Sequence, residues 1–346
     1  MGGRRLALPG FVSAHSHAFQ RGLRGRASGG DFWAWRDAML AEAERQTPES
    51  VRAGYEAAYG ELRRAGYTAV GEFHYLGLDE AFAAVDAAAA AGIEITLLLA
   101  AYERGGLPRF RQRSIADYFE QVERLRAEGV RVGVAPHSVR ACSANWLVEV
   151  GRYAETEGLV LHVHADEQLR EIEECLAEHG LRPIELLGRS GCLGPGATVV
   201  HATHADDREL DLLAETGTRV CLCPTSESDL GDGFAPVDRV LEREIAICIG
   251  SDSNVRIDPL EELRELEGIA RRQAGRREVI PVEALLEMGT TSGADALAID
   301  VWPDIEIHVD HPSLAGVLLE QVPAALVSSC GADVLAPTGE AGLRPT

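Results

Sequence analysis

Short, continuously apolar stretches alternate along the chain with longer stretches in which apolar residues recur at helical spacing. Apolar stretches rich in Val, Ile, Leu and Ala are typical of parallel strands that are buried on both faces. Eight segments have this character: residues 6–15, 69–75, 95–102, 130–139, 159–165, 198–203, 219–225 and 246–251. The alternation predicts an α/β fold in which helices join parallel strands.

The segments between these strands carry the helical period. They are residues 31–44, 48–65, 79–91, 115–128, 144–157, 169–189, 206–215 and 259–273. On average, successive strands begin about 34 residues apart, which is close to the length of one βαβ unit. Regular steps of this length predict a closed (β/α)8 TIM-type barrel over residues 6–300, followed by a C-terminal tail over residues 301–346. An open doubly wound sheet is the competing fold, but no G-x-G-x-x-G follows the first strand.

The charge of the chain excludes several functions. Its 346 residues include 55 acidic and 33 basic residues, for a net charge of −22, and every basic residue is arginine. We expect no nucleic-acid partner, because binding to phosphate backbones depends on clustered cations. The absence of lysine excludes Schiff-base catalysis, a P-loop lysine and any metal pair bridged by a modified lysine.

The cysteines and the apolar segments indicate where the protein works. Its seven cysteines show no C-x-x-C spacing, so we expect free thiols, with Cys221 and Cys223 as small buried residues. No segment has the roughly 18 consecutive apolar residues of a membrane span, and the N-terminus lacks the apolar region of a signal peptide. These features predict a cytoplasmic protein without a membrane partner. We also expect a homodimer, the commonest assembly of soluble proteins.

Side chains that bind metals fall at the carboxyl ends of the predicted strands, which form the catalytic face of a TIM-type barrel. His15 and His17 lie at the end of the first strand, and their spacing puts both side chains on one side of it. His162 and His164 repeat this spacing at the fifth strand, and Glu167 follows them. A single H-x-H is a weak signal, because core histidines with satisfied hydrogen bonds also produce it.

Further candidate ligands occur at two other strand ends. His201 and His204 end the sixth strand, and Asp252 ends the eighth. Imidazole and carboxylate ligands suit zinc or a similar divalent ion. The coincidence of such residues at several strand ends favours a metal site over isolated core histidines.

At these residues the chain resembles the amidohydrolase superfamily, and specifically its mononuclear deaminase branch. The resemblance covers about residues 8–298. In that branch the H-x-H pair, a fifth-strand histidine and an eighth-strand aspartate bind one divalent metal ion, for which we expect zinc. The resemblance therefore implies the ligand set His15, His17, His164 and Asp252.

Longer motifs resemble one family in that branch, the N-formimidoyl-L-glutamate deiminases of histidine degradation. The motifs are LPGFVSAHSHAFQRGL, FWAWR, GYTAVGEFHY, APHSVR, HVHADEQ, VHATH, CPTSESDLGDG and GSDSNVRIDPLEELR. The resemblance implies a hydrolase that cleaves a C–N bond of a linear amidine, with N-formyl-L-glutamate and ammonia as products. It also implies that a small substrate is held by Gln20, Arg36, Tyr75, His137 and Arg140. Arginines suit a dicarboxylate substrate because their planar guanidinium groups bind carboxylates bidentately.

We expect catalysis to depend on Glu167, His201 and Asp252. Water on a bound zinc ion has a pKa of roughly 7, and Asp252 would accept its proton. Glu167 would deliver a proton to the nitrogen that leaves as ammonia. His201 would hydrogen-bond the tetrahedral centre that forms on the substrate.

Two other functions compete with this prediction. The first keeps the chemistry but changes the substrate to another amidine, a guanidine or an aminated heterocycle. The motifs depart from the family at Asp166, Asp229 and Asn254, and the two aspartates predict added negative charge near the site. Asp166 and the shortened ends favour this alternative, whereas Arg36 and Arg140 oppose it. The second is a catalytically silent barrel that binds a partner, which the intact ligand set and Glu167 disfavour.

Two segments outside the barrel strands carry further expectations. Members of the family carry an accessory β-sandwich, but only about seven residues precede the first strand here, so we expect that sandwich to be truncated or absent. Residues 305–309 and 324–328 are candidate strands of such a remnant. Residues 103–114, which contain four arginines, form either a solvated loop or a lid over the active face.

Overall fold

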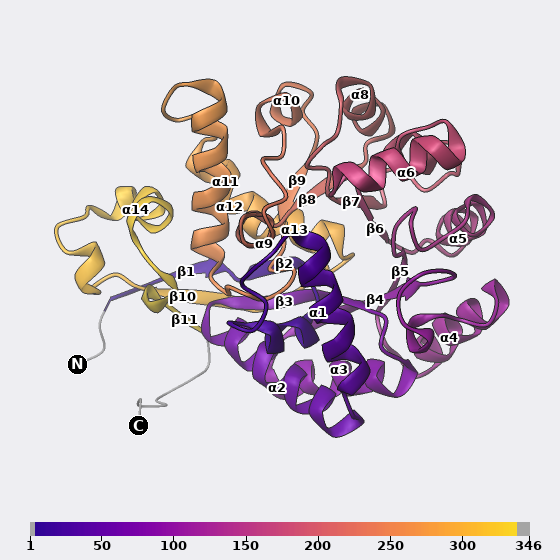
Figure 1. Ribbon diagram of the computed structural model, residues 1–346. Helices are drawn as coiled ribbons and strands as arrows, with labels where there is room; N and C mark the ends of the chain where they lie inside the picture. The colour runs from indigo at the N-terminus through magenta and orange to yellow at the C-terminus, as the bar shows by residue number, and fades with distance from the viewer. Residues whose placement is uncertain (1–3, 338–346) are drawn as a thin grey trace.

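Eight parallel strands form a nearly closed barrel in the computed structural model, which describes residues 4–337 (Figure 1). The strands follow one another in chain order: β2 (Phe11–Ser16), β3 (Tyr67–His74), β4 (Glu94–Ala101), β5 (Val132–Pro136), β6 (Leu161–Ala165), β7 (Ala197–His201), β8 (Arg219–Leu222) and β9 (Ile247–Ile249). A parallel bridge between Ser16 and Asp252 joins β2 to the end of β9. The predicted (β/α)8 barrel is confirmed.

Helices surround the barrel (Figure 1). They are α1 (Phe32–Arg45), α2 (Pro48–Arg64), α3 (Leu78–Ala91), α4 (Ile115–Ala127), α5 (Ala144–Glu157), α6 (Leu169–His179), α7 (Pro183–Arg189), α8 (Asp207–Thr216), α9 (Pro224–Leu230), α10 (Val237–Glu242), α11 (Pro259–Ala274), α12 (Val282–Gly289), α13 (Thr291–Ala296) and α14 (Val322–Ser329). The single helix predicted over residues 169–189 is wrong. Gly180 ends α6 with φ 67°, a conformation that suits glycine, and Pro183 begins α7.

The first apolar segment is two strands rather than one. Gly10 separates β1 (Arg5–Pro9) from β2, and a Cβ at this position would lie 1.9 Å from Thr68 Oγ1 and 2.4 Å from the Pro303 carbonyl oxygen. The chain can pass between these atoms only because residue 10 has no side chain.

A small antiparallel sheet with the order β1-β10-β11 lies beside the barrel (Figure 1). It pairs β1 with β10 (Asp304–His308), and β10 with β11 (Leu335–Pro337). Within residues 4–337 it is the one sheet outside the barrel. The strand expected at residues 324–328 is wrong, because these residues lie in α14.

The interior of the protein is apolar, and it contains the cysteines as free, buried thiols, as predicted. Cys221 and Cys223 pack with Cys248 and three small or branched apolar residues in one buried cluster. Among the described residues, no helix combines the length and the apolar character needed to cross a bilayer.

Candidate metal and catalytic site

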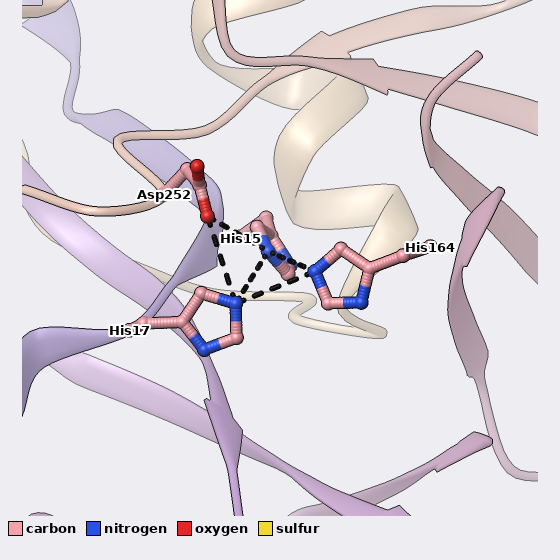
Figure 2. Close-up of side chains that lie close together, drawn as sticks. All are labelled: His15, His17, His164 and Asp252. Atoms are coloured by element: carbon pink, nitrogen blue, oxygen red, sulfur yellow. Dashed lines mark hydrogen bonds and ion pairs between the residues drawn. The ribbon is translucent and has the colours of Figure 1, made fainter. Parts of the chain in front are cut away.

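Three imidazoles and one carboxylate converge at the carboxyl end of the barrel (Figure 2). The Nε2 atoms of His15 and His17 lie 3.1 Å apart, and His164 Nε2 lies 3.1 Å and 3.3 Å from them. Asp252 Oδ1 lies 3.3 Å from His15 Nε2 and 3.6 Å from His17 Nε2. All four side chains are buried, so the barrel brings the predicted ligands of three different strands to one point.

The backbone holds two of these histidines in the tautomer that binds metals. His17 Nδ1 donates a hydrogen bond to the Phe73 carbonyl oxygen at 3.0 Å, and His164 Nδ1 donates one to the His137 carbonyl oxygen at 2.9 Å. Each Nε2 lone pair therefore faces the cluster. Burial lowers the pKa of His17 well below its usual value and that of His164 to about 4, so both rings are neutral.

These contacts fit a divalent ion of the zinc type. In a tetrahedral site with Zn–N bonds of roughly 2.1 Å, neighbouring ligand atoms lie about 3.4 Å apart, close to the spacings found here. The Nε2 lone pairs of His17 and His164 also face each other at 3.3 Å, and a cation between them would remove their repulsion. The four side chains therefore form a divalent-metal site.

Asn254 holds the backbone of the metal ligand Asp252 through hydrogen bonds. It is fully buried, and its Nδ2 donates to Ser16 Oγ at 3.1 Å and to the Asp252 carbonyl oxygen at 2.9 Å, while its Oδ1 accepts from Ser251 Oγ at 2.9 Å. Asp252 and Asn254 have φ values of 41° and 54°, which lie in the left-handed region that residues other than glycine rarely adopt. Strained backbone of this kind is typical of functional sites.

Glu167 and His201 lie next to the metal ligands. His201 Nε2 is 3.6 Å from Glu167 Oε1, and its Nδ1 is 3.2 Å from Glu227 Oε1. Burial opposes the protonation of His201, but nearby carboxylates, Glu167 first among them, raise its pKa to about 10. The predicted catalytic residues Glu167, His201 and Asp252 thus share one buried corner of the site.

Arg140 is paired with carboxylates of the protein itself. Its Nη2 lies 3.0 Å from Glu167 Oε2, and its Nε lies 3.4 Å from Glu171 Oε1. Glu171 is fully buried and also accepts a hydrogen bond from the Glu167 backbone N–H at 3.2 Å. Although burial opposes the charge, these carboxylates raise the pKa of Arg140 and hold its guanidinium beside Glu167.

A pocket of about 240 Å³ opens onto this corner, and the five predicted substrate-binding residues line it. Gln20 comes from the 3₁₀ turn Ala18–Leu23 after β2, and Arg36 comes from α1. Tyr75 follows β3, and its hydroxyl accepts a hydrogen bond from Gln20 Nε2 at 3.0 Å. His137 and Arg140 follow β5.

Arg36 differs from Arg140 in its surroundings. Among residues 4–337, no carboxylate forms an ion pair with the Arg36 guanidinium. Arg36 lies near Tyr102, where burial raises the pKa of the Tyr102 hydroxyl and the Arg36 charge opposes that shift. Arg36 therefore presents an uncompensated positive charge to the pocket.

Sequence reasoning missed several residues of the site, notably Glu171, Glu227 and Tyr102. Glu227 stands in the motif CPTSESDLGDG, five residues beyond the end of β8, but only the fold shows that it faces His201. Trp33 and Arg104 also line the pocket. Arg104 belongs to segment 103–114, so that segment forms part of the pocket wall.

Neither aspartate that departs from the family motifs lines the pocket. Asp229 is an exposed residue of α9. Asp166 is fully buried, and Arg182 Nη2 lies 3.8 Å from its Oδ1. The two carboxylates therefore do not form part of the pocket wall.

Comparison with known proteins agrees with this arrangement. Residues 6–301 match the model of the family described as "Amidohydrolase family". The formimidoylglutamate deiminase of Pseudomonas aeruginosa is 37% identical over 289 residues, which cover 75% of this chain and 63% of that relative. The 5-methylthioadenosine/S-adenosylhomocysteine deaminase of Haloarcula marismortui is 34% identical over 303 residues, which cover 85% of this chain and 69% of that relative.

Solved structures share the fold. An adenosine deaminase from Xanthomonas campestris with bound zinc superposes with a TM-score of 0.87 at 23% identity, over 96% of this chain and 78% of that chain. An amidohydrolase from Brucella melitensis gives a TM-score of 0.81 at 29% identity, over 95% of this chain and 84% of that chain.

Proposed function

The chain belongs to the amidohydrolase family, and from this membership and the site described above we propose that it is a metal-dependent deaminase. We further propose that its substrate is N-formimidoyl-L-glutamate, which it hydrolyses to N-formyl-L-glutamate and ammonia in histidine degradation. The formimidoylglutamate deiminase of Pseudomonas aeruginosa supports this substrate through its 37% identity, although the chain spans 63% of that relative. Zinc, which is bound in the related Xanthomonas structure, is the proposed ion.

The observation that carries this proposal is the uncompensated guanidinium of Arg36 in a pocket that ends at the metal site. In a chain with a net charge of −22, an anionic substrate needs a local cation to bind. Arg36 supplies a planar donor for a carboxylate, and Gln20 and Tyr75 add neutral hydrogen-bonding groups nearby.

A divalent ion held by His15, His17, His164 and Asp252 would supply a water molecule whose pKa is lowered to roughly 7. The Asp252 carboxylate accepts a proton from the attacking water, whose oxygen forms a bond to the formimidoyl carbon. His201 donates a hydrogen bond from Nε2 to that oxygen. Glu167 in its protonated form delivers a proton to the terminal nitrogen, and the C–N bond breaks as ammonia leaves. The carbonyl group forms as the proton of the added hydroxyl passes to the Glu167 carboxylate, which restores the proton donor, and the proton on Asp252 is released with the products.

Arg140 is proposed to have two partners during this reaction. It contacts Glu167 at 3.0 Å, which restricts the position of the proton donor. The remaining N–H groups of its guanidinium are available to a substrate carboxylate, since a guanidinium carries five of them. Arg140 thus links substrate binding to the position of Glu167.

A second candidate function is the deamination of an aminated heterocycle such as a purine nucleoside. The aromatic lining of the pocket favours it, because Phe32, Trp33 and Trp35 of α1 line the pocket together with Tyr75 and Tyr102. The 34% identity to the Haloarcula marismortui deaminase supports the same candidate.

Ammonia release from the purified, zinc-loaded protein tests the proposal. N-formimidoyl-L-glutamate is compared with 5′-methylthioadenosine, adenosine and neutral amidines at equal concentration. We expect release from N-formimidoyl-L-glutamate to be fastest. The Glu167→Gln variant is the control, and it should retain its metal but lose turnover, since the amide cannot deliver the proton.

Each contrary result has a distinct meaning. Faster release from a nucleoside would replace the amidine substrate by the second candidate. A Glu167→Gln variant that turns over at the parent rate would refute the role of Glu167. Metal loss together with activity in that variant would mean that Glu167 supports the metal site instead.

A further inference from the structure

We infer that Glu227 is a positioning residue that holds the His201 ring in its working orientation. Glu227 lies in α9, and only 2% of it is exposed. Its Oε1 atom lies 3.2 Å from His201 Nδ1 and accepts a hydrogen bond from the Cys223 backbone N–H at 2.9 Å. The Oε1 atom of Glu227 therefore links the His201 ring at the end of β7 to the backbone at the start of α9.

The His201 ring needs such support because its backbone is strained. The φ angle of His201 is 74° and that of Ala202 is 51°, so the end of β7 leaves the strand conformation in the left-handed region. The ring stacks on His164 with centroids 5.6 Å apart and planes inclined by 24°. Stacking restrains the plane of the ring, but a hydrogen bond to one nitrogen determines which nitrogen faces the pocket.

The contact with Glu227 makes that choice. Because Nδ1 donates to Glu227, Nε2 is the nitrogen directed toward Glu167, 3.6 Å from Oε1. His201 lines the pocket, whereas Glu227 does not. Glu227 therefore acts through His201 and not by touching a substrate.

The chain offers a matched control in Glu262. This second buried glutamate accepts a hydrogen bond from the Thr225 backbone N–H at 3.0 Å, in the same turn of α9 that Glu227 holds through Cys223. Its carboxylate also binds the Thr225 hydroxyl. Removing either glutamate loosens α9, but only the removal of Glu227 frees His201.

The kinetic test is a double-mutant cycle on the zinc-loaded protein, with Glu227→Ala and His201→Ala, and it rests on the proposed function. We expect Glu227→Ala to lower kcat about 10- to 100-fold with KM and metal content unchanged. In the His201→Ala background, Glu227→Ala should have no further effect. Glu227→Gln should restore most of the rate, because its amide oxygen can accept both hydrogen bonds.

The inference is overturned if the two losses multiply in the cycle, or if Glu262→Ala lowers kcat as much as Glu227→Ala does. Loss of metal in Glu227→Ala would also overturn it, because the residue would then support the metal ligands. Should Glu227→Ala not fold, Glu227→Asp provides the same test, since shortening the side chain by one methylene withdraws the oxygen from Nδ1.

A second readout does not depend on the substrate. The hydrogen-bonded Nδ1–H of His201 should give a proton NMR resonance downfield of the amides, identified by its loss in His201→Ala. We expect this resonance to disappear in Glu227→Ala and to persist in Glu262→Ala. Persistence in Glu227→Ala would overturn the inference, whereas a parent protein that shows the resonance but leaves N-formimidoyl-L-glutamate intact would refute only the proposed function.

Discussion

Replacing Arg36 by methionine provides a sharp test of how this pocket selects its substrate. Arg36 lines the pocket, and no described carboxylate forms an ion pair with it, so its removal leaves no buried charge unpaired. A hydrogen bond to a charged group contributes about 1.5–3 kcal/mol, which corresponds to a factor of roughly 10 to 150. We therefore expect Arg36→Met to lower kcat/KM for N-formimidoyl-L-glutamate about 10- to 150-fold.

The assay measures ammonia release for two substrates, N-formimidoyl-L-glutamate and a neutral amidine without carboxylates. The neutral amidine should react equally well with the parent and with Arg36→Met. Arg140→Met should impair both substrates, because Arg140 also holds Glu167 at 3.0 Å. An equal loss for both substrates in Arg36→Met, or no loss at all, would refute the assignment of Arg36 to carboxylate binding.

Three further predictions concern the scaffold of the site. Asn254→Ala should lower the free energy of unfolding in urea by about 1–3 kcal/mol, because it removes three buried hydrogen bonds, and an unchanged value would contradict this. Gly250→Ala should weaken zinc binding about 10- to 100-fold in a chelator competition, since its Cβ would lie 2.8 Å from the His15 carbonyl oxygen. Gly133→Ala is the control, because its Cβ would meet Leu98 and Val160, which are not metal ligands. It should lower the melting temperature without weakening zinc binding, and equal metal loss in both variants would argue against this reasoning. Burial raises the pKa of Glu262 to about 8, so the folded protein favours the protonated side chain. The contribution of this side chain to the free energy of unfolding is therefore present below pH 4.5 and is lost as the pH rises through 8. Glu262→Gln should therefore gain stability relative to the parent between pH 5 and 9, by up to about 5 kcal/mol in urea titrations, and a pH-independent difference would contradict the shift.

The barrel and its metal ligands could be predicted because they follow from local patterns. Buried parallel strands produce continuous apolar segments, and His15, His17, His164 and Asp252 stand at the ends of such segments. Once the strands close into a barrel, their carboxyl ends meet on one face. The order of the strands in the barrel is therefore enough to predict that the four ligands meet.

Other parts of the prediction failed where a short apolar pattern suits more than one structure. Residues 324–328 have the composition of a strand, but they form most of α14, because a short apolar segment is compatible with either element. The segment 6–15 contains two strands of different sheets, since Gly10 passes against Thr68 and Pro303, which are distant in the sequence. The break between α6 and α7 has a local signal in Gly180 and Pro183, but the helical period on both sides of it suits one continuous helix equally well.

The sequence by itself determined the type of chemistry: the ligand set, an acidic chain without lysine, and arginines suited to an anionic substrate. Only the tertiary structure decided how the charged groups pair. Within residues 4–337 it shows Arg140 paired with Glu167 and Glu171, Arg36 without a carboxylate partner, and Asp166 outside the pocket lining. The physical reason is that periodicity encodes the conformation and burial of each segment, whereas ion pairs join side chains from different segments. Their partners depend on packing distances that no local pattern contains.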